Sequence, residues 1–242
     1  MNKNALIYIL SIIALGTALC FVTVRQIDCC AAPNDYLLAL FLVLLATGSQ
    51  IGKVLYKSQG ETGSGTSWYT PLLSFIFAGV FVLPPYMLVA VVVVPHLVEW
   101  AIERARKTPF LRAWYIQPFN IATHIICSLL AWEIYVVATP MLTTLLPSNL
   151  AAKLLASVLA GLVYLIMNHY LVGQVMVLAC RVTWMQSGVL SLKNAACDAG
   201  FLLAGVGTAL LMTLTPLVVL PLITLLLFMQ RRLAVTLVRS SV

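Results

Sequence analysis

Apolar runs about 20 residues long recur along the chain, and this repetition limits the fold more than any other feature of the sequence. A helix rises about 1.5 Å per residue, so such a run spans the roughly 30 Å hydrocarbon core of a bilayer. Hydrophobic residues make up 62% of the 242 and charged residues 9%, a balance that would leave a soluble domain with large exposed apolar surfaces. Strands of an outer-membrane barrel alternate apolar and polar residues, and no such alternation is visible. The sequence therefore predicts an all-α, polytopic integral membrane helical bundle.

Proline, glycine and charged residues divide the chain into eight predicted helices within a single transmembrane domain, residues 1–242. The predicted helices cover residues 5–24, 35–56, 69–83, 85–107, 110–138, 149–180, 192–213 and 216–238. The third is too short to span upright, and Pro84 and Pro85 separate it from the fourth. We expect this short or broken pair to be tilted or to cross half of the membrane, which puts the number of helices between six and eight.

The basic residues are distributed unevenly between the two sides that eight membrane passes would create. If both termini are cytoplasmic, all of the 14 Lys and Arg residues except Arg25 and Lys153 fall on the cytoplasmic side. Cytoplasmic loops collect Lys and Arg in this way. We therefore expect a multi-pass protein of the bacterial cytoplasmic (inner) membrane with cytoplasmic N and C termini. Contacts with anionic headgroups account for the net charge of +7, so the charge requires no nucleic acid as a partner.

A few polar and ionisable residues lie inside the predicted helices, where charge is costly and a functional role is the default explanation. His96 and Glu99 share one face of a predicted helix, and Gln117, Asn120 and His124 share one face of the next. The complete candidate cluster is His96, Glu99, Gln117, Asn120, His124, Glu133, Asn168 and His169. Two interpretations remain open. The cluster forms interhelical hydrogen bonds that stabilise the bundle, or it lines a shared cavity that recognises a small ligand or passes a signal.

No motif for catalysis, for a metal or for a cofactor is present. The chain lacks G-x-S-x-G, H-E-x-x-H and paired C-x-x-C patterns, and its three histidines lie on different predicted helices. We expect a local network of Glu99 and Glu103 with Arg106 or Arg112, and neither a metal site nor an enzyme. Most cysteines are expected to be small buried apolar residues, whereas Cys29-Cys30 lies in a loop and is left without an assigned role.

The glycine-rich segment Gly60–Ser67, GETGSGTS, is one residue short of the phosphate-binding pattern G-x-x-x-x-G-K-[ST]. Thr66 stands where the pattern requires Lys, no strand precedes the segment, and Pro71 opens a membrane helix beyond it. Nucleotide binding is therefore not expected here. The Gly and Ser content is typical of a flexible tether, which would let the short third helix tilt independently of the second.

Two stretches of the sequence resemble a known family. They are PHLVEWAIERARKTPFLRAWYIQPFNIATHI and LVYLIMNHYLVGQVMVLACRVTWMQSGVLSLKNAACDAGFLLAGVGTALL, followed by the closing LTPLVVLPLITLLLFMQRRL. The chain is similar here to the N-terminal multi-helix membrane module of bacterial signalling proteins, Chloroflexota-like, in which a GGDEF diguanylate cyclase or HD-GYP phosphodiesterase domain follows. The resemblance covers roughly Leu72 to Leu233. It is most recognisable at His96, Glu99, Trp100, Trp114, Gln117, Phe119 and Asn120.

In this sequence no output domain follows the last predicted helix, so the family's catalytic activity does not carry over. What the resemblance implies is a membrane-embedded sensory, regulatory or scaffolding module, in contact with the lipid bilayer and acting alone or through a protein partner. Two alternatives remain. One is an accessory subunit of a larger respiratory or photosynthetic membrane complex. The other is the substrate-binding subunit of a small-molecule, vitamin-type transporter, for which the break at Pro84 and Pro85 would suit a site at the membrane midplane.

Overall fold

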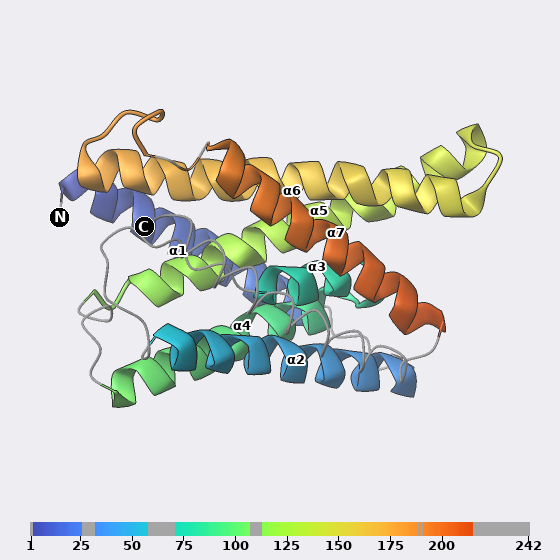
Figure 1. Ribbon diagram of the computed structural model, residues 1–242, viewed down its shortest axis with the longest axis horizontal. Helices are drawn as coiled ribbons and strands as arrows, with labels where there is room; N and C mark the ends of the chain where they lie inside the picture. The colour runs from blue at the N-terminus through green and yellow to red at the C-terminus, as the bar shows by residue number, and fades with distance from the viewer. Residues whose placement is uncertain are drawn as a thin grey trace.

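The computed structural model describes residues 2–25, 32–57, 71–106, 113–187, 189 and 191–214. Within these ranges the chain forms helices joined by turns and short extended segments, with no strand, as Figure 1 shows. The helices are α1 (Lys3–Arg25), α2 (Pro33–Lys57), α3 (Leu72–Val82), α4 (Pro85–Ala105), α5 (Ile116–Leu145), α6 (Asn149–Cys180) and α7 (Leu192–Leu214). The predicted helix 216–238, the segment Gly60–Ser67, Cys29, Cys30 and Arg112 lie outside the described residues.

The lengths and surfaces of the helices confirm the predicted helical membrane bundle. Six of the described helices are long and apolar enough to cross a bilayer, and α3, with 11 residues, is the shorter exception. Large apolar side chains such as Ile7, Leu37 and Leu145 are exposed on the outside of the bundle. Lipid tails solvate such side chains as well as a protein interior does, so this surface fits a multi-pass membrane protein.

Helix α5 extends further than the sequence predicts, since it continues through Pro140 to Leu145 instead of ending at residue 138. Proline leaves one carbonyl of the preceding turn without an N–H donor, and membrane helices tolerate this where neighbouring groups compensate. The Thr139 hydroxyl donates a hydrogen bond to the Tyr135 carbonyl, and α6 packs along α5. Both interactions support the helix on either side of the proline.

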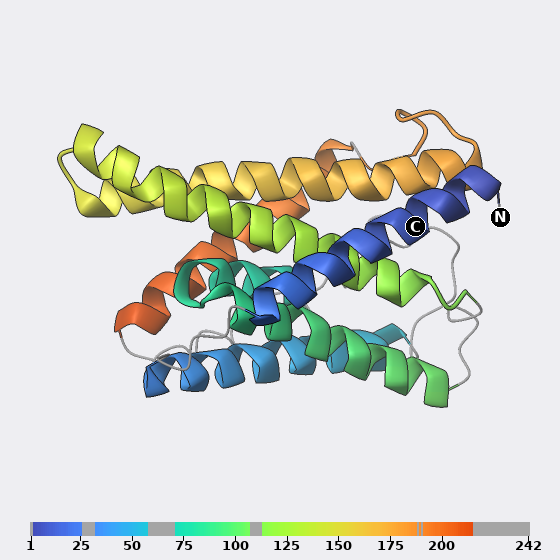
Figure 2. The same cartoon turned by 180° about the vertical axis from the view of Figure 1, so that it is seen from behind.

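One end of the bundle carries most of the described charge. Helix α1 begins at this end, α2, α4 and α6 end there, and α5 begins there (Figures 1 and 2). We call it the basic end, since Lys3, Arg104, Arg106 and Arg181 mark the helix ends that meet there. Lys153 lies in the first turn and a half of α6 at the opposite end, and Arg25 ends α1, which stops about midway along the bundle (Figure 2). The helices thus bring these four described basic residues to one end of the bundle.

Helix α3 lies at the centre of the bundle (Figure 1). Every residue from Leu72 to Val80 is buried, and the helix packs against α7, α2, α5 and α4. A helix that is apolar on all sides is stable where protein surrounds it completely. The break before α4 falls where the sequence predicts it: Leu83 and Pro84 are extended, and Pro85 occupies the first turn of α4.

Small residues let two pairs of helices approach closely. A Cβ atom on Gly16 of α1 would lie 2.6 Å from the Cβ of Ala122 on α5. A Cβ on Gly205 of α7 would lie 2.7 Å from the Ser74 carbonyl oxygen on α3. Neither contact leaves room for a side chain, so glycine at these positions determines how α1 and α7 pack onto the core.

Candidate functional site

Four side chains from α4, α5 and α6 meet in the core, and we call them the polar file: Glu99, His96, His124 and Tyr164. His124 is half-buried and the other three are buried. Glu99 Oε2 lies 3.6 Å from Nδ1 of His96. The His96 ring stacks on the His124 ring, with centroids 5.2 Å apart and planes inclined by 22°. His124 Nδ1 in turn shares a hydrogen bond of 2.6 Å with the Tyr164 hydroxyl. The file therefore links three helices through titratable or hydrogen-bonding groups.

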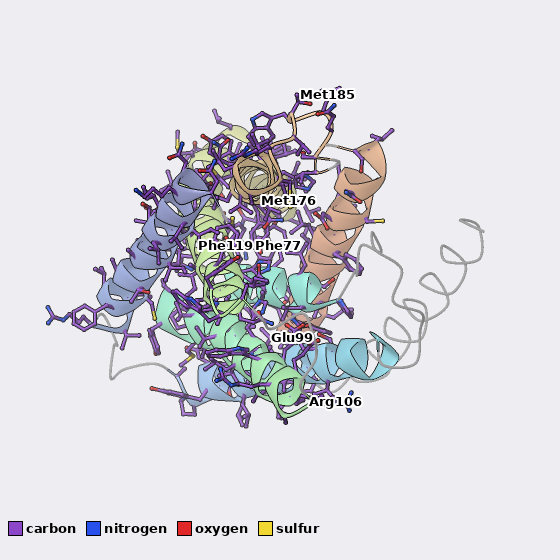
Figure 3. The ribbon with its side chains drawn as sticks, turned by 90° about the vertical axis from the view of Figure 1, so that its left-hand side faces the viewer. Phe77, Glu99, Arg106, Phe119, Met176 and Met185 are labelled. Atoms are coloured by element: carbon purple, nitrogen blue, oxygen red, sulfur yellow. The ribbon has the colours of Figure 1, made fainter. Side chains whose placement is uncertain are left out.

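The positions of these residues follow from helix geometry. His96 and Glu99 are three residues apart, so they lie on one face of α4, and this face packs against α5. Tyr164 is 0% exposed, and its ring meets Phe77 of α3 edge-on, with centroids 5.9 Å apart. Figure 3, which looks along the bundle, shows Phe77 in this interior. The central helix thus forms the apolar wall against which the file ends.

Several polar atoms on α4 and α5, the helices that carry His96 and His124, are buried but unpaired. Within the described residues, both ring nitrogens of His96, Oε1 of Gln117 and Oγ1 of Thr123 have no hydrogen-bond partner, and His96 is 3% exposed. The 3.6 Å separation from Glu99 is within reach of an ion pair but too long for a hydrogen bond. An unpaired buried polar group costs about 1–3 kcal/mol. Such groups persist in a membrane interior mainly where function requires them.

The unpaired groups extend from the basic end towards the centre of the bundle. Gln117 lies in the first turn of α5, and His124 lies seven residues, or about 10 Å, further along the same helix. Because seven residues are close to two helical turns, the two side chains occupy the same face. Polar groups therefore follow one face of α5 over about two turns, from Gln117 near the basic end to His124.

The structure brings only part of the predicted cluster together. His96, Glu99 and His124 belong to the polar file, and Gln117 lies on its α5 face. Of the remaining candidates, Asn120 on α5 and Asn168 on α6 are half-buried, Glu133 is exposed on α5, and His169 belongs to a separate pair on α6 and α7.

Sequence reasoning missed two partners of the predicted histidines. Tyr164 lies in a long apolar run that gives no sign of a hydrogen bond. Asp198, by contrast, is an ionisable residue inside a predicted membrane helix, which is by itself a signal of function.

His169 forms the second polar cluster, which we call the clasp. Its Nε2 lies 3.0 Å from Oδ2 of Asp198 on α7, and its Nδ1 lies 2.7 Å from the Val189 carbonyl oxygen. His169 is buried and Asp198 half-buried. The clasp therefore holds α6, α7 and the segment between them together, and both ring nitrogens of His169 are engaged.

A groove of about 530 Å³ lies beside the clasp. Its lining residues are Leu165, Ile166, His169, Tyr170, Gln174, Trp184 and Ala195. Trp184 stacks on Tyr170 with ring centroids 5.8 Å apart and planes inclined by 19°. A Cβ on Gly173 would overlap the Trp184 ring, so only glycine admits this contact. The groove thus has one wall on α6 and one wall formed by an aromatic side chain that folds back onto it.

The turn that carries Trp184 is fixed by its own hydrogen bonds. The Thr183 backbone N–H donates to Oε1 of Gln186 at 3.0 Å, and the Gln186 N–H donates to Oγ1 of Thr183 at 3.3 Å. This reciprocal arrangement is that of a capping box. It holds Trp184 on the groove, while Met185 points away at the periphery of the molecule (Figure 3).

Within the described residues, no group of three or more His, Cys, Asp or Glu side chains has the geometry to hold a metal ion. The comparisons leave the chain without an assigned family: no family model, no curated protein and no solved structure matches it.

Proposed function

We propose that the chain is a membrane-embedded sensory or regulatory module whose input acts on the polar file. The observation that supports this most is the set of unpaired buried groups on His96, Gln117 and Thr123. A bundle selected for stability alone would gain by replacing them with apolar side chains. One of them, His96, lies beside an ionisable residue, Glu99, and such a pair is expected of a site that binds a small polar solute or a proton.

The response would be a change in the packing of α4, α5 and α6. The file joins these helices through the stack of His96 on His124 and the hydrogen bond of His124 to Tyr164. A solute or proton that binds His96 would therefore weaken or strengthen both of these contacts. A ligand shifts such an equilibrium only through its differential affinity for the two packings. Helices α4 and α6 both end at the basic end (Figure 1), and a partner that binds there would detect the change.

We further propose that the basic end faces the cytoplasm, and that the partner is a soluble protein that binds there. The charge asymmetry supports this orientation. The module then supplies the input and the partner supplies the output.

Affinity capture from native membranes tests the proposal. The tagged chain is captured at about pH 6 and about pH 8, and with a panel of amino acids, amines, carboxylic acids and nucleobases. We expect a soluble partner whose recovery changes with pH or with one of these solutes. Gln117→Leu should abolish the change, and Asn168→Leu, on α6 outside the file, should preserve it. A partner recovered equally under all conditions, or none at all, would count against a sensory role.

Transport is a second candidate, supported by a different observation. Helix α3 and the start of α4 form a broken element at the centre of the bundle, and transporters use such elements to build midplane binding sites. The two functions differ in their partners. A transport subunit of the vitamin-uptake type should purify from native membranes with an ATPase pair, whereas a sensory module should not.

A further inference from the structure

The groove beside the clasp opens onto the lipid-facing surface of the bundle. Ile166 and Tyr170, two of its lining residues, are 64% and 53% exposed. Both lie on α6, which is long and apolar enough to span the membrane. The molecules that reach this opening from outside are therefore those of the bilayer. The groove is separate from the polar file and plays no part in the proposed input.

Polarity along the groove follows the order found in a phospholipid. The part of the groove that lies farthest from the basic end is lined by Leu165 and Ile166, and about 14 Å nearer the basic end the lining reaches Gln174. Tyr170 and Trp184 lie between or beside them, and aromatic residues of these types are enriched where acyl chains meet headgroups. An exposed cation, Arg181, follows about 10 Å beyond Gln174 at the end of α6.

The polar groups available in the groove are suited to an ester region and an anionic headgroup. His169 already uses both ring nitrogens, and the charge of Asp198 is engaged by His169 at 3.0 Å. Within the described residues, the Tyr170 hydroxyl and the Gln174 amide make no hydrogen bond, so both can donate to an ester oxygen.

The walls of the groove are fixed before any ligand binds. The stack on Tyr170, the close fit over Gly173 and the capping box together hold Trp184 in place. A preformed groove binds with less loss of conformational entropy than one that must be ordered.

We propose that this groove holds one anionic phospholipid of the surrounding bilayer. One acyl chain packs against Leu165 and Ile166, the ester region meets Tyr170 and Gln174, and the phosphate lies near Arg181.

Native mass spectrometry of the full chain tests this proposal. The protein is reconstituted in nanodiscs of equimolar phosphatidylglycerol and phosphatidylcholine, released into mild detergent, and the retained lipids are identified. We expect one phosphatidylglycerol on the wild type. Ala195→Trp fills the groove and should remove it, and Ile166→Trp, which covers the opening from an exposed position, provides a second blocking variant. Leu203→Trp, on the exposed face of α7, should retain the lipid.

Arg181→Gln distinguishes the contribution of the headgroup to binding from that of the acyl chain. This variant should still retain a lipid but lose preference for phosphatidylglycerol over phosphatidylcholine by about fivefold, the equivalent of one basic contact at a membrane surface. The proposal is overturned if the wild type retains no lipid or retains both lipids equally. It is also overturned if both blocking variants retain phosphatidylglycerol at the wild-type level, or if Leu203→Trp loses it as readily as they do.

Discussion

Replacing Tyr164 by Phe removes one hydroxyl from the centre of the bundle and leaves the ring in place. The hydroxyl is bonded to Nδ1 of His124 at 2.6 Å, and Tyr164 is fully buried. The aromatic contact with Phe77 should survive, because it depends on the ring and not on the hydroxyl. The substitution therefore isolates the hydrogen bond that joins α5 to α6.

Two known ranges bound the loss in free energy of unfolding that we expect for Tyr164→Phe. Hydrogen bonds between membrane helices contribute about 0.6 kcal/mol on average and up to about 1.7. A buried group that loses its partner costs about 1–3 kcal/mol. The bond here is short and its Tyr164 end is fully buried, and its loss removes the Tyr164 partner of His124 Nδ1. We therefore expect a loss of about 1.5 kcal/mol, which for a chain of this size lowers the melting temperature by about 3–6 °C.

Thermal unfolding in detergent, followed by circular dichroism, measures this effect. Tyr170→Phe is the matched control, since Tyr170 lies on the same helix, is about half exposed and makes no hydrogen bond within the described residues. The control should melt within about 1 °C of the wild type, as surface substitutions usually do. If Tyr164→Phe has the same melting temperature as Tyr170→Phe, the hydrogen bond to His124 does not stabilise the polar file, and our account of the file is wrong.

Three further outcomes follow from the packing and the topology. Gly205→Leu adds a side chain whose Cβ would lie 2.7 Å from the Ser74 carbonyl oxygen, so it should lower the free energy of unfolding by about 3 kcal/mol or prevent folding. Gly207→Leu should fold normally, because no atom lies within 4 Å of the added Cβ. Equal yields and melting temperatures of the two variants would refute the close packing of α7 on α3. Asp198→Asn weakens the clasp and should increase tryptic cleavage after the exposed Arg181 several-fold, a rise that limited proteolysis detects and that an unchanged rate would contradict. Alkaline phosphatase fused after Pro147 should be active and fused after Arg181 inactive, because the enzyme folds outside the cytoplasm; the reverse pattern would invert the proposed orientation.

Much of the fold can be predicted from the sequence, because hydropathy and helix breakers act locally. The apolar runs that became α1, α2, α4, α6 and α7 match the predicted ranges closely, and the break at Pro84 falls where proline chemistry requires it. The end of α5 was placed too early at residue 138, because the rule that proline ends a helix ignores support from a neighbouring helix.

The candidate site was harder to predict, since it depends on how helices rotate against one another. Helical spacing correctly put Gln117 and His124 on one face, but spacing within one helix cannot show that His96 stacks on His124. It also grouped His169 and Glu133 with residues that lie elsewhere in the structure. Tyr164, Trp184 and Gly173 acquire their roles from tertiary contacts alone.

Thr123→Val tests most directly whether the unpaired buried groups take part in binding a solute or a proton. Valine has nearly the shape of threonine, and Thr123 is buried with an unpaired hydroxyl, so the variant should be as stable as the wild type or up to about 2 kcal/mol more stable. Thr208→Val, which breaks an existing hydrogen bond of 2.8 Å to the Ala204 carbonyl, should instead destabilise.

Melting temperatures of the wild type and both variants are measured from about pH 6 to about pH 8 and with the panel of small polar solutes. The account predicts a wild-type shift that persists in Thr208→Val and is lost in Thr123→Val, together with equal or greater stability of Thr123→Val without a solute. A destabilised Thr123→Val, or a shift identical to that of the wild type, would contradict it.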